Sequence, residues 1–318
     1  MLIKFNYISP LFNIANFIEA ILRRRFSSTG LSLQILSIDS ETTIQFWAPP
    51  PSPSPENQKK PSLLLLHGFG PSALWQWSHQ VKPLSKVFRL YIPDLVFFGG
   101  STTTSSSSDE NRSEIFQASC MRKLMEKLGV ERFSVVGTSY GGFVAYNMAK
   151  MLPEKLEKVI LASSGVNMRR SDNEAFIARA KCHGVAEVML PSSATDIRRF
   201  SGMVSTKRLD YVPDFVLNDF CQKMYSEKRE EKARLLEGLT IGRDNNLNVT
   251  PIEQDVMLIW GELDQVFPLK MAYHLKEMLG KKATLKVIPK TSHIPQLEKS
   301  KEFNGIVMSF LLPPYPSL

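Results

Sequence analysis

Cysteine is scarce in this chain of 318 residues, and the spacing of the three that are present excludes the usual cysteine-based sites. Cys120, Cys182 and Cys221 are an odd number, lie far apart and form no C-x-x-C pair. A disulfide framework and a zinc site built on paired cysteines are therefore not predicted, and three reduced thiols are expected. The sequence implies neither a metal nor a cofactor.

Long apolar runs are also missing, because no stretch reaches the ~18 residues that a membrane-spanning helix needs. Residues 5–22 come nearest, but polar residues interrupt them and Arg23–Arg25 follow at once. A secretory signal would carry its positive charge before the apolar segment. Residues 1–30, the N-terminal arm, leave three alternatives: a helix lying on a membrane, a helix packed on its own domain or a partner, and an organellar transit peptide. We expect a cytoplasmic protein, with peripheral membrane contact or organellar targeting as alternatives.

No region holds a concentrated excess of positive charge. The chain has 39 Lys and Arg against 31 Asp and Glu, and the net charge of +8 is spread along its length. A nucleic-acid partner is therefore not predicted. Hydrophobic residues make up 43% of the chain and charged residues 22%, which is enough apolar material for a globular core.

Short apolar strands alternate with helical patterns over most of the chain. The expected buried strands are Ser62–Leu66, Arg89–Ile92, Phe133–Val136, Leu156–Ala162, Gln254–Trp260 and Thr284–Ile288. This alternation predicts an α/β fold with a mostly parallel sheet flanked by helices. Residues 31–48 predict a hairpin with a polar turn, and one helix is expected over Ser72–Val87.

The alternation breaks once, over residues 167–250, where no strand pattern is present. Amphipathic helices are expected there instead, for example over Asn173–Cys182 and Pro213–Leu236. The chain therefore divides into the N-terminal arm, a first core part over residues 31–166, an inserted helical lid over residues 167–250, and a second core part over residues 251–318.

A G-x-S-x-G motif, Gly137-Thr138-Ser139-Tyr140-Gly141, lies between an expected strand and an expected helix. In this context it predicts a nucleophile elbow, a strained turn that lifts the serine hydroxyl to the end of the sheet. Glycine is needed on both sides because larger side chains would clash with the packed strand and helix. Ser139 is therefore the candidate nucleophile.

A nucleophilic serine needs a base, and the base needs a carboxylate that orients it. His293 follows the last expected strand, at the right end of the sheet, and Asp264 lies in the loop after the preceding strand. Glu262 and Asp172 are alternatives for the acid. The order Ser139, Asp264, His293 is the one typical of such an elbow.

The loop His67-Gly68-Phe69-Gly70 ends the first buried strand, and its glycines allow the backbone to turn close to the serine. The N–H groups of Phe69 and Tyr140 are predicted to hold a developing oxyanion. His67 is expected to shape this loop by hydrogen bonding.

These motifs, with Trp260-Gly-Glu-Leu-Asp264 and the late Ser-His, resemble the α/β-hydrolase superfamily over roughly residues 35–166 and 251–318. Within it, the chain looks like plant-type serine hydrolases similar to carbon–carbon bond hydrolases of the 2-hydroxymuconate-semialdehyde type. A D-L-x-x-x-G-x-S loop begins at Asp94 and rims the pocket in that family. The resemblance therefore implies that Phe97 and Phe98 contact an apolar substrate, with packing under the lid as the alternative.

The resemblance implies a serine hydrolase that forms an acyl-enzyme on Ser139 and cleaves a small, mostly apolar ester or a C–C bond. A serine at the elbow excludes the epoxide and haloalkane hydrolases, which carry an acid there. The alternative is a receptor for butenolide hormones, which uses the same fold, begins its oxyanion loop with a similar His-Gly-Phe-Gly, and turns over slowly.

Overall fold

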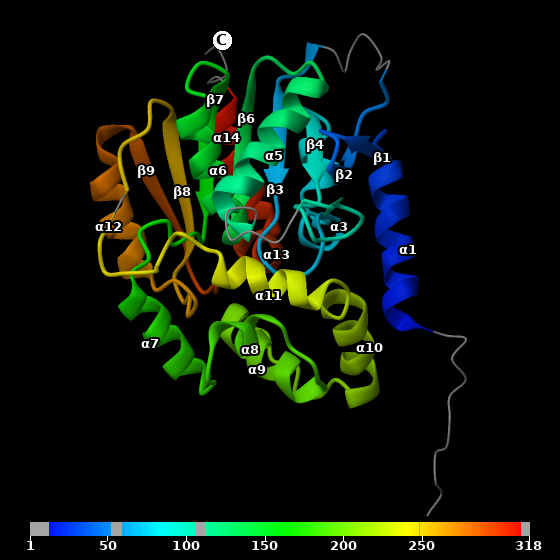
Figure 1. Cartoon of the computed structure of the whole chain (residues 1–318), viewed down its shortest axis with the longest axis vertical. Helices are drawn as coiled ribbons and strands as arrows, with labels where there is room; N and C mark the ends of the chain where they lie inside the picture. The colour runs from blue at the N-terminus through cyan, green and yellow to red at the C-terminus, as the bar shows by residue number, and fades with distance from the viewer. Residues whose placement is uncertain (1–12, 52–58, 106–111, 248, 313–318) are drawn as a thin grey trace, which may run out of the picture.

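A central sheet organises the computed structural model, which describes residues 13–51, 59–105, 112–247 and 249–312 (Figure 1). Its strands are β1 (Ser32–Ser37), β2 (Thr42–Ala48), β3 (Ser62–Leu66), β4 (Arg89–Pro93), β5 (Thr102–Thr103), β6 (Phe133–Thr138), β7 (Leu156–Ala162), β8 (Asp255–Gly261) and β9 (Ala283–Ile288). The order is β1-β2-β4-β3-β6-β7-β8-β9, with β5 paired to β2. The ladders from β4 through β9 are parallel, and those of β2 are antiparallel. The predicted α/β fold with a mostly parallel sheet is confirmed.

Helices cover both faces of this sheet. One face carries α1 (Ile14–Ser27), α3 (Ala73–Gln76), α4 (Val81–Leu84) and α14 (Ser300–Leu311), and the other carries α5 (Glu114–Lys127), α6 (Tyr140–Met151) and α12 (Leu269–Leu279). Strand β3 shows that both faces of the sheet are buried: Leu63 and Leu65 pack in one apolar cluster, and Leu64 and Leu66 pack in the other. A continuous apolar run is what two covered faces require.

The hairpin prediction is confirmed, whereas the single helix expected over Ser72–Val87 is wrong. In the hairpin turn, Asp39 Oδ1 accepts the Thr42 N–H at 2.7 Å. The helix is interrupted between α3 and α4, where Trp77 is fully buried and Gln80 Nε2 donates to the Gln296 carbonyl at 2.7 Å. These long-range contacts override the local helical pattern.

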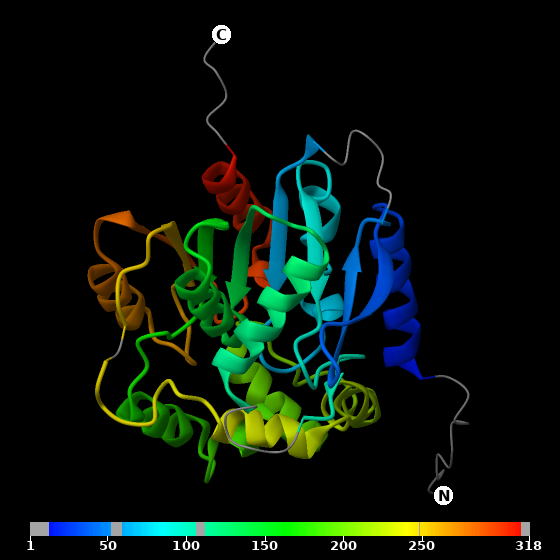
Figure 2. The ribbon, with the colours of Figure 1, turned by 45° about the horizontal axis from the view of Figure 1, so that its top comes forward.

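Five helices enter between β7 and β8 and lie across the carboxyl ends of the strands (Figures 1 and 2). They are α7 (Arg170–Ala180), α8 (Val185–Met189), α9 (Ala194–Val204), α10 (Asp214–Tyr225) and α11 (Arg229–Glu237), called here the insertion helices. The single helix expected over Pro213–Leu236 is wrong, because Lys228 has a φ of 50° and separates α10 from α11. Its ammonium donates to the carbonyls of Gly99 and Ser101, at 2.9 and 2.8 Å.

Helix α1 packs on the edge of the sheet and reaches the insertion helices (Figure 1). Leu22 and Phe26 are buried, and the Phe26 ring lies 5.2 Å from that of Trp47 on β2. Glu19 pairs with Lys223 of α10 at 2.7 Å. Of the alternatives for the N-terminal arm, the described part forms a helix packed on its own domain, and residues 1–12 lie outside the described residues. No helix in the described ranges is long and apolar enough to span a membrane.

Candidate active site

Ser139 occupies a strained turn between β6 and α6. Its φ of 51° and ψ of −120° are rarely adopted by residues other than glycine. The Ser139 N–H donates to the Ala162 carbonyl of β7 at 2.9 Å, which ties the turn to the sheet. A Cβ at Gly137 would collide with the Gly141 carbonyl, and a Cβ at Gly141 would collide with the Leu66 carbonyl. Strand and helix therefore approach closely enough only because both positions are glycine.

The structure brings Ser139, His293 and Asp264 into one hydrogen-bonded series. His293 Nε2 lies 2.9 Å from Ser139 Oγ, and His293 Nδ1 lies 2.9 Å from Asp264 Oδ2. Asp264 Oδ1 also accepts the N–H groups of Val266 and Phe267, each at 2.9 Å. Because the buried carboxylate can only accept, Nδ1 carries the imidazole proton and Nε2 offers its lone pair to the serine hydroxyl.

The two other carboxylates considered from sequence lie elsewhere. Glu262 is exposed and accepts the Lys290 N–H at 2.9 Å. Asp172 accepts the Arg169 N–H at 2.9 Å and so caps the start of α7. Neither hydrogen bonds to His293 within the described residues.

Two backbone N–H groups lie next to the serine without a hydrogen-bond partner in the described parts of the chain: those of Phe69, just after β3, and Tyr140, the first residue of α6. The first amides of a helix have no partner inside the helix, and they attract negative charge. Gln76 holds the neighbouring loop by accepting the Gly68 N–H at 2.9 Å and donating to the Gly68 carbonyl at 2.8 Å. No pattern in the sequence distinguishes Gln76 for this role.

His67 shapes the same loop through both ring nitrogens. Its Nδ1 donates to the Gly68 carbonyl at 2.8 Å, and its Nε2 accepts the Leu95 N–H at 2.9 Å. Burial lowers the pKa of this fully enclosed imidazole, so it stays neutral and rigid. It hydrogen bonds within the loop, as predicted.

Glu298 was also missed from sequence, although it joins the His293 loop to the insertion. Its Oε2 accepts the Ser292 N–H at 2.7 Å, and its Oε1 accepts the Thr206 N–H at 2.7 Å. Nothing in the local pattern distinguishes it from other surface glutamates in the chain, because its partners lie just before His293 and after α9.

Phe97 and Phe98 do not line either cavity that opens on Ser139 in the described structure, which corrects the expectation that they contact substrate. Both are buried. Phe98 packs its ring 5.3 Å from that of Phe69, and the Arg112 guanidinium lies 4.4 Å from the centre of the Phe97 ring. They lie behind the loop that carries Phe69 and support it, because their own loop turns inward where Phe97 has a φ of 75°.

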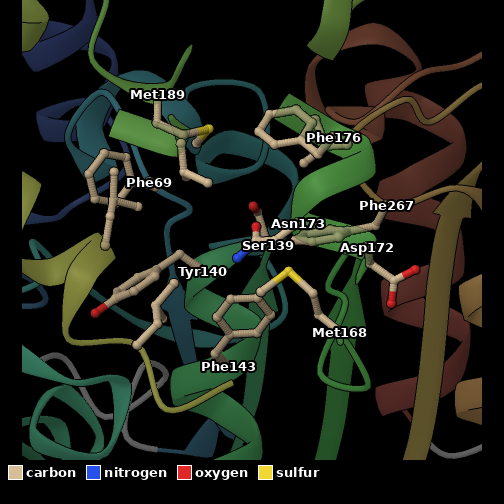
Figure 3. A pocket seen from close by; sticks show the side chains of 14 residues that line it. Phe69, Ser139, Tyr140, Phe143, Met168, Asp172, Asn173, Phe176, Met189 and Phe267 are labelled. Atoms are coloured by element: carbon tan, nitrogen blue, oxygen red, sulfur yellow. The ribbon is translucent and has the colours of Figure 1, made fainter. Parts of the chain in front are cut away.

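Two apolar cavities meet at Ser139, and Phe69 and Met189 line both of them. The small chamber, of about 50 Å³, has walls formed chiefly by Phe143, Met168, Phe176, Leu236, Leu239 and Phe267 (Figure 3). The large chamber, of about 330 Å³, has walls formed chiefly by Ile197, Phe200, Val204, Leu209, Tyr225 and Leu297. Core loops and insertion helices contribute to both chambers.

None of the three cysteines lines either chamber in the described structure. All three cysteines are free, and burial raises the pKa of the Cys120 thiol to about 12. Among the described residues, no group of three or more histidines, cysteines and carboxylates is arranged to hold a metal ion.

A serine, a carboxylate and a histidine that follow one another in this order along the chain, at the carboxyl ends of parallel strands, are typical of α/β hydrolases. The model of the alpha/beta hydrolase fold family matches residues 61–300, and the chain belongs to this family.

Relatives within the family act on different bonds. The chain is 26% identical over 261 residues to the 2-hydroxy-6-oxo-6-phenylhexa-2,4-dienoate hydrolase of Comamonas testosteroni, covering 79% of this chain and 87% of the relative. It is 26% identical over 246 residues to the pimeloyl-[acyl-carrier protein] methyl ester esterase of Vibrio campbellii, covering 76% and 91%. A solved membrane phospholipase A, a bacterial virulence factor, is similar in fold, with a TM-score of 0.77 at 21% identity over 95% of this chain and 92% of that one.

Proposed function

We propose that this protein is a serine hydrolase that cleaves a small, mostly apolar carboxylic ester through an acyl-enzyme on Ser139. The observation that carries the proposal is the hydrogen-bonded series from Ser139 Oγ through His293 to the buried Asp264. A serine hydroxyl is a weak nucleophile until a neighbouring base removes its proton. This geometry supplies that base, already oriented, at hydrogen-bond distance.

The contacts support the following reaction. His293 Nε2 takes the proton of Ser139 Oγ as the oxygen attacks the ester carbonyl, and Asp264 stabilises the imidazolium that forms. The N–H groups of Phe69 and Tyr140 hold the negative carbonyl oxygen. His293 then gives its proton to the departing alcohol. Water, activated by the same imidazole, releases the acid from Ser139.

The walls of the two chambers support an apolar ester over a carboxylate-bearing C–C substrate. Relatives include both esterases and C–C bond hydrolases, so family membership does not choose between them. Apart from His293, Lys207 is the one basic side chain among the described residues that line either chamber. A dienoate carboxylate bound there would have little charge compensation, whereas an apolar ester needs none.

The insertion helices act in this proposal as a lid over residues 167–250. Met189 of α8 lines both chambers, Phe176 of α7 lines the small chamber and Phe200 of α9 lines the large one. Substrate choice therefore depends on the insertion, and bond cleavage depends on the core parts over residues 31–166 and 251–318.

Fluorophosphonate labelling of wild type and Ser139→Ala tests the proposed function. Ser139→Ala should abolish labelling and lower ester turnover by about 10³-fold or more, while the free energy of unfolding changes by less than about 1 kcal/mol. Ester turnover retained by purified Ser139→Ala protein would contradict the assignment. Labelling of wild type together with very slow turnover of every ester, and ligand-dependent partner binding, would favour the receptor alternative.

We further propose that the outer face of α1 contacts an anionic membrane surface. Phe17 and Ile21 lie one turn apart, with exposed fractions of 54% and 47%. Arg24, Arg25 and Lys82 line an open groove beside Ile21, and no salt bridge in the described structure uses any of these three cations. Exposed apolar side chains beside unpaired basic groups are typical of interfacial helices.

Co-sedimentation with vesicles of phosphatidylserine and phosphatidylcholine tests the membrane proposal. A Phe17→Ala, Ile21→Ala double variant should pellet less than wild type at low salt, and high salt should weaken the pelleting of wild type. Ile35→Ala is the control, because Ile35 is 65% exposed on β1 and does not line the groove that holds these cations. Equal pelleting of all three proteins would contradict the proposal.

A further inference from the structure

The two chambers at Ser139 are not equivalent, because His293 lines the large chamber and does not line the small one. The large chamber also contains Ile294 and Leu297, which follow His293 on its loop and on α13 (Pro295–Glu298). The small chamber instead extends below the Ser139 elbow towards Phe143 of α6 and Met168, which Figure 3 shows beside the serine. The serine thus has a histidine side and a side away from the histidine.

Acyl transfer gives these two sides different occupants. When Ser139 Oγ adds to the carbonyl, the carbonyl oxygen points to the N–H groups of Phe69 and Tyr140. The departing oxygen must lie near His293 Nε2, because this nitrogen protonates it. The alcohol part of the ester therefore extends into the large chamber, and the acyl part has the small chamber left to it.

The volumes then decide the shape of the substrate. A dry apolar cavity of roughly 150 Å³ takes one benzene molecule. The large chamber, at about 330 Å³, exceeds that size, and the small chamber, at about 50 Å³, falls well below it. An aromatic or long acyl group does not fit the small chamber without displacing its walls, whereas an acyl group of a few carbons does.

The polar lining of the small chamber also restricts the acyl group. Asp172 and Asn173 of α7 line it, and no basic side chain does so among the described residues. A carboxylate on the acyl part would find no basic side chain among the described residues of this chamber to offset its charge. The small chamber therefore favours acyl groups that are short and uncharged.

We propose, on the basis of the proposed function, that the substrates are short-chain acyl esters, acetates above all, of bulky apolar alcohols. The small chamber limits the acyl part and the large chamber accepts the alcohol. A methyl ester of a large acid, the bond type in the name of the Vibrio campbellii relative, has its bulk on the opposite side of the carbonyl.

Two isomeric esters test this orientation without a difference in composition. Naphthylmethyl acetate carries its ring on the alcohol part, and methyl naphthylacetate carries the same ring on the acyl part. Both release an ordinary alkanol, so the leaving groups have similar chemical reactivity. For the wild-type protein we expect kcat/KM to be about tenfold or more higher for naphthylmethyl acetate, a difference of about 1.4 kcal/mol.

Two Phe→Ala variants of the insertion helices form a matched pair. Phe176→Ala enlarges the small chamber and should raise kcat/KM for methyl naphthylacetate by about tenfold. Phe200→Ala enlarges the large chamber and should not raise it. Circular dichroism checks that Phe176→Ala is folded. If it is not, Phe176→Leu, which removes less volume, replaces it in the same comparison.

The outcomes separate the inference from the proposed function. Ser139-dependent hydrolysis with equal rates for the two isomers, or a preference for methyl naphthylacetate, would overturn the inference and leave the serine hydrolase intact. Fluorophosphonate labelling of Ser139 without hydrolysis of either isomer would overturn it too. Loss of all Ser139-dependent labelling and hydrolysis would instead overturn the proposed function.

Discussion

The sheet around Ser139 and the insertion helices above it are held together by different kinds of contact. In the sheet, β8 and β9 pair in register over six residues, and Trp260 is fully buried with its indole N–H donating to the Phe267 carbonyl at 2.8 Å. The insertion has a small buried cluster of its own around Ile197, Leu217 and Cys221. It also joins the main apolar cluster through side chains such as Val188, Leu190 and Leu235, and single side-chain bonds such as that from Lys228 to Gly99 tie it to the core loops.

In the proposed function, this difference separates bond cleavage from substrate choice. The atoms that would break a bond are positioned by strand ends, glycine contacts and a buried carboxylate. In such tightly packed surroundings a small displacement costs much free energy. The chamber walls come largely from helices that few backbone contacts constrain. Mutations in the core should therefore affect turnover or folding strongly, and mutations in the insertion should mainly change substrate preference or have small effects.

The largest expected difference within the core concerns two carboxylates in one loop. Asp264→Asn should lower ester turnover by about 10²-fold or more, because the imidazolium loses its charged partner and the ring its fixed tautomer. Glu262→Gln should leave turnover within about threefold of wild type, since the Glu262 carboxylate accepts the Lys290 N–H and makes no hydrogen bond to His293 in the described structure. Steady-state kinetics on naphthylmethyl acetate compares the two. A stronger loss with Glu262→Gln would transfer the acid role to Glu262.

A smaller but still clear difference is expected between two glycines. Gly141→Ala should lower the free energy of unfolding by about 2 kcal/mol or more, because the new methyl group would collide with the Leu66 carbonyl. Gly202→Ala, in α9 of the insertion, should raise it by about 0.5–1 kcal/mol, since no atom lies within 4 Å of the new methyl group. Urea unfolding measures both. Equal effects would show that the insertion is packed as tightly as the core.

The smallest predicted effect is a loss of stability in mild acid that comes from the core. The pKa of His67 is lowered by burial, so below pH ~6.5 the unfolded chain takes up a proton that the folded chain refuses. The free energy of unfolding should therefore fall as the pH drops through that value, by at most about 1.4 kcal/mol at pH 5.5 from this group. His67→Gln should flatten the dependence in urea unfolding at pH 7.5 and 5.5. An unchanged slope in this variant would mean that other groups cause the acid sensitivity.

Much of the core was predictable because its signals are local. Continuous apolar runs such as Ser62–Leu66 predicted buried parallel strands, and the strand–turn–helix context of Gly137–Gly141 predicted the elbow. The order of Ser139, Asp264 and His293 along the chain, each after a strand, predicted that they would meet at one edge of the sheet. The structure places all three there.

Predictions failed where the deciding contact lies far away in sequence. The helices expected over Ser72–Val87 and Pro213–Leu236 both break, in the first case where Gln80 bonds to the Gln296 carbonyl. Phe97 and Phe98 look like substrate contacts by resemblance, but they turn inward. Helical periodicity and family resemblance carry no information about these partners.

The sequence alone thus determined the fold class and the candidate residues for bond cleavage, because glycine spacing and apolar runs act on the backbone within a few residues. Only the tertiary structure decided which loops Gln76 and Glu298 hold, where α1 packs, and how the space around Ser139 divides into unequal chambers. The division into chambers depends on side chains from segments more than a hundred residues apart, such as Phe69, Phe176 and Leu297, and their sizes combine only after the chain has folded.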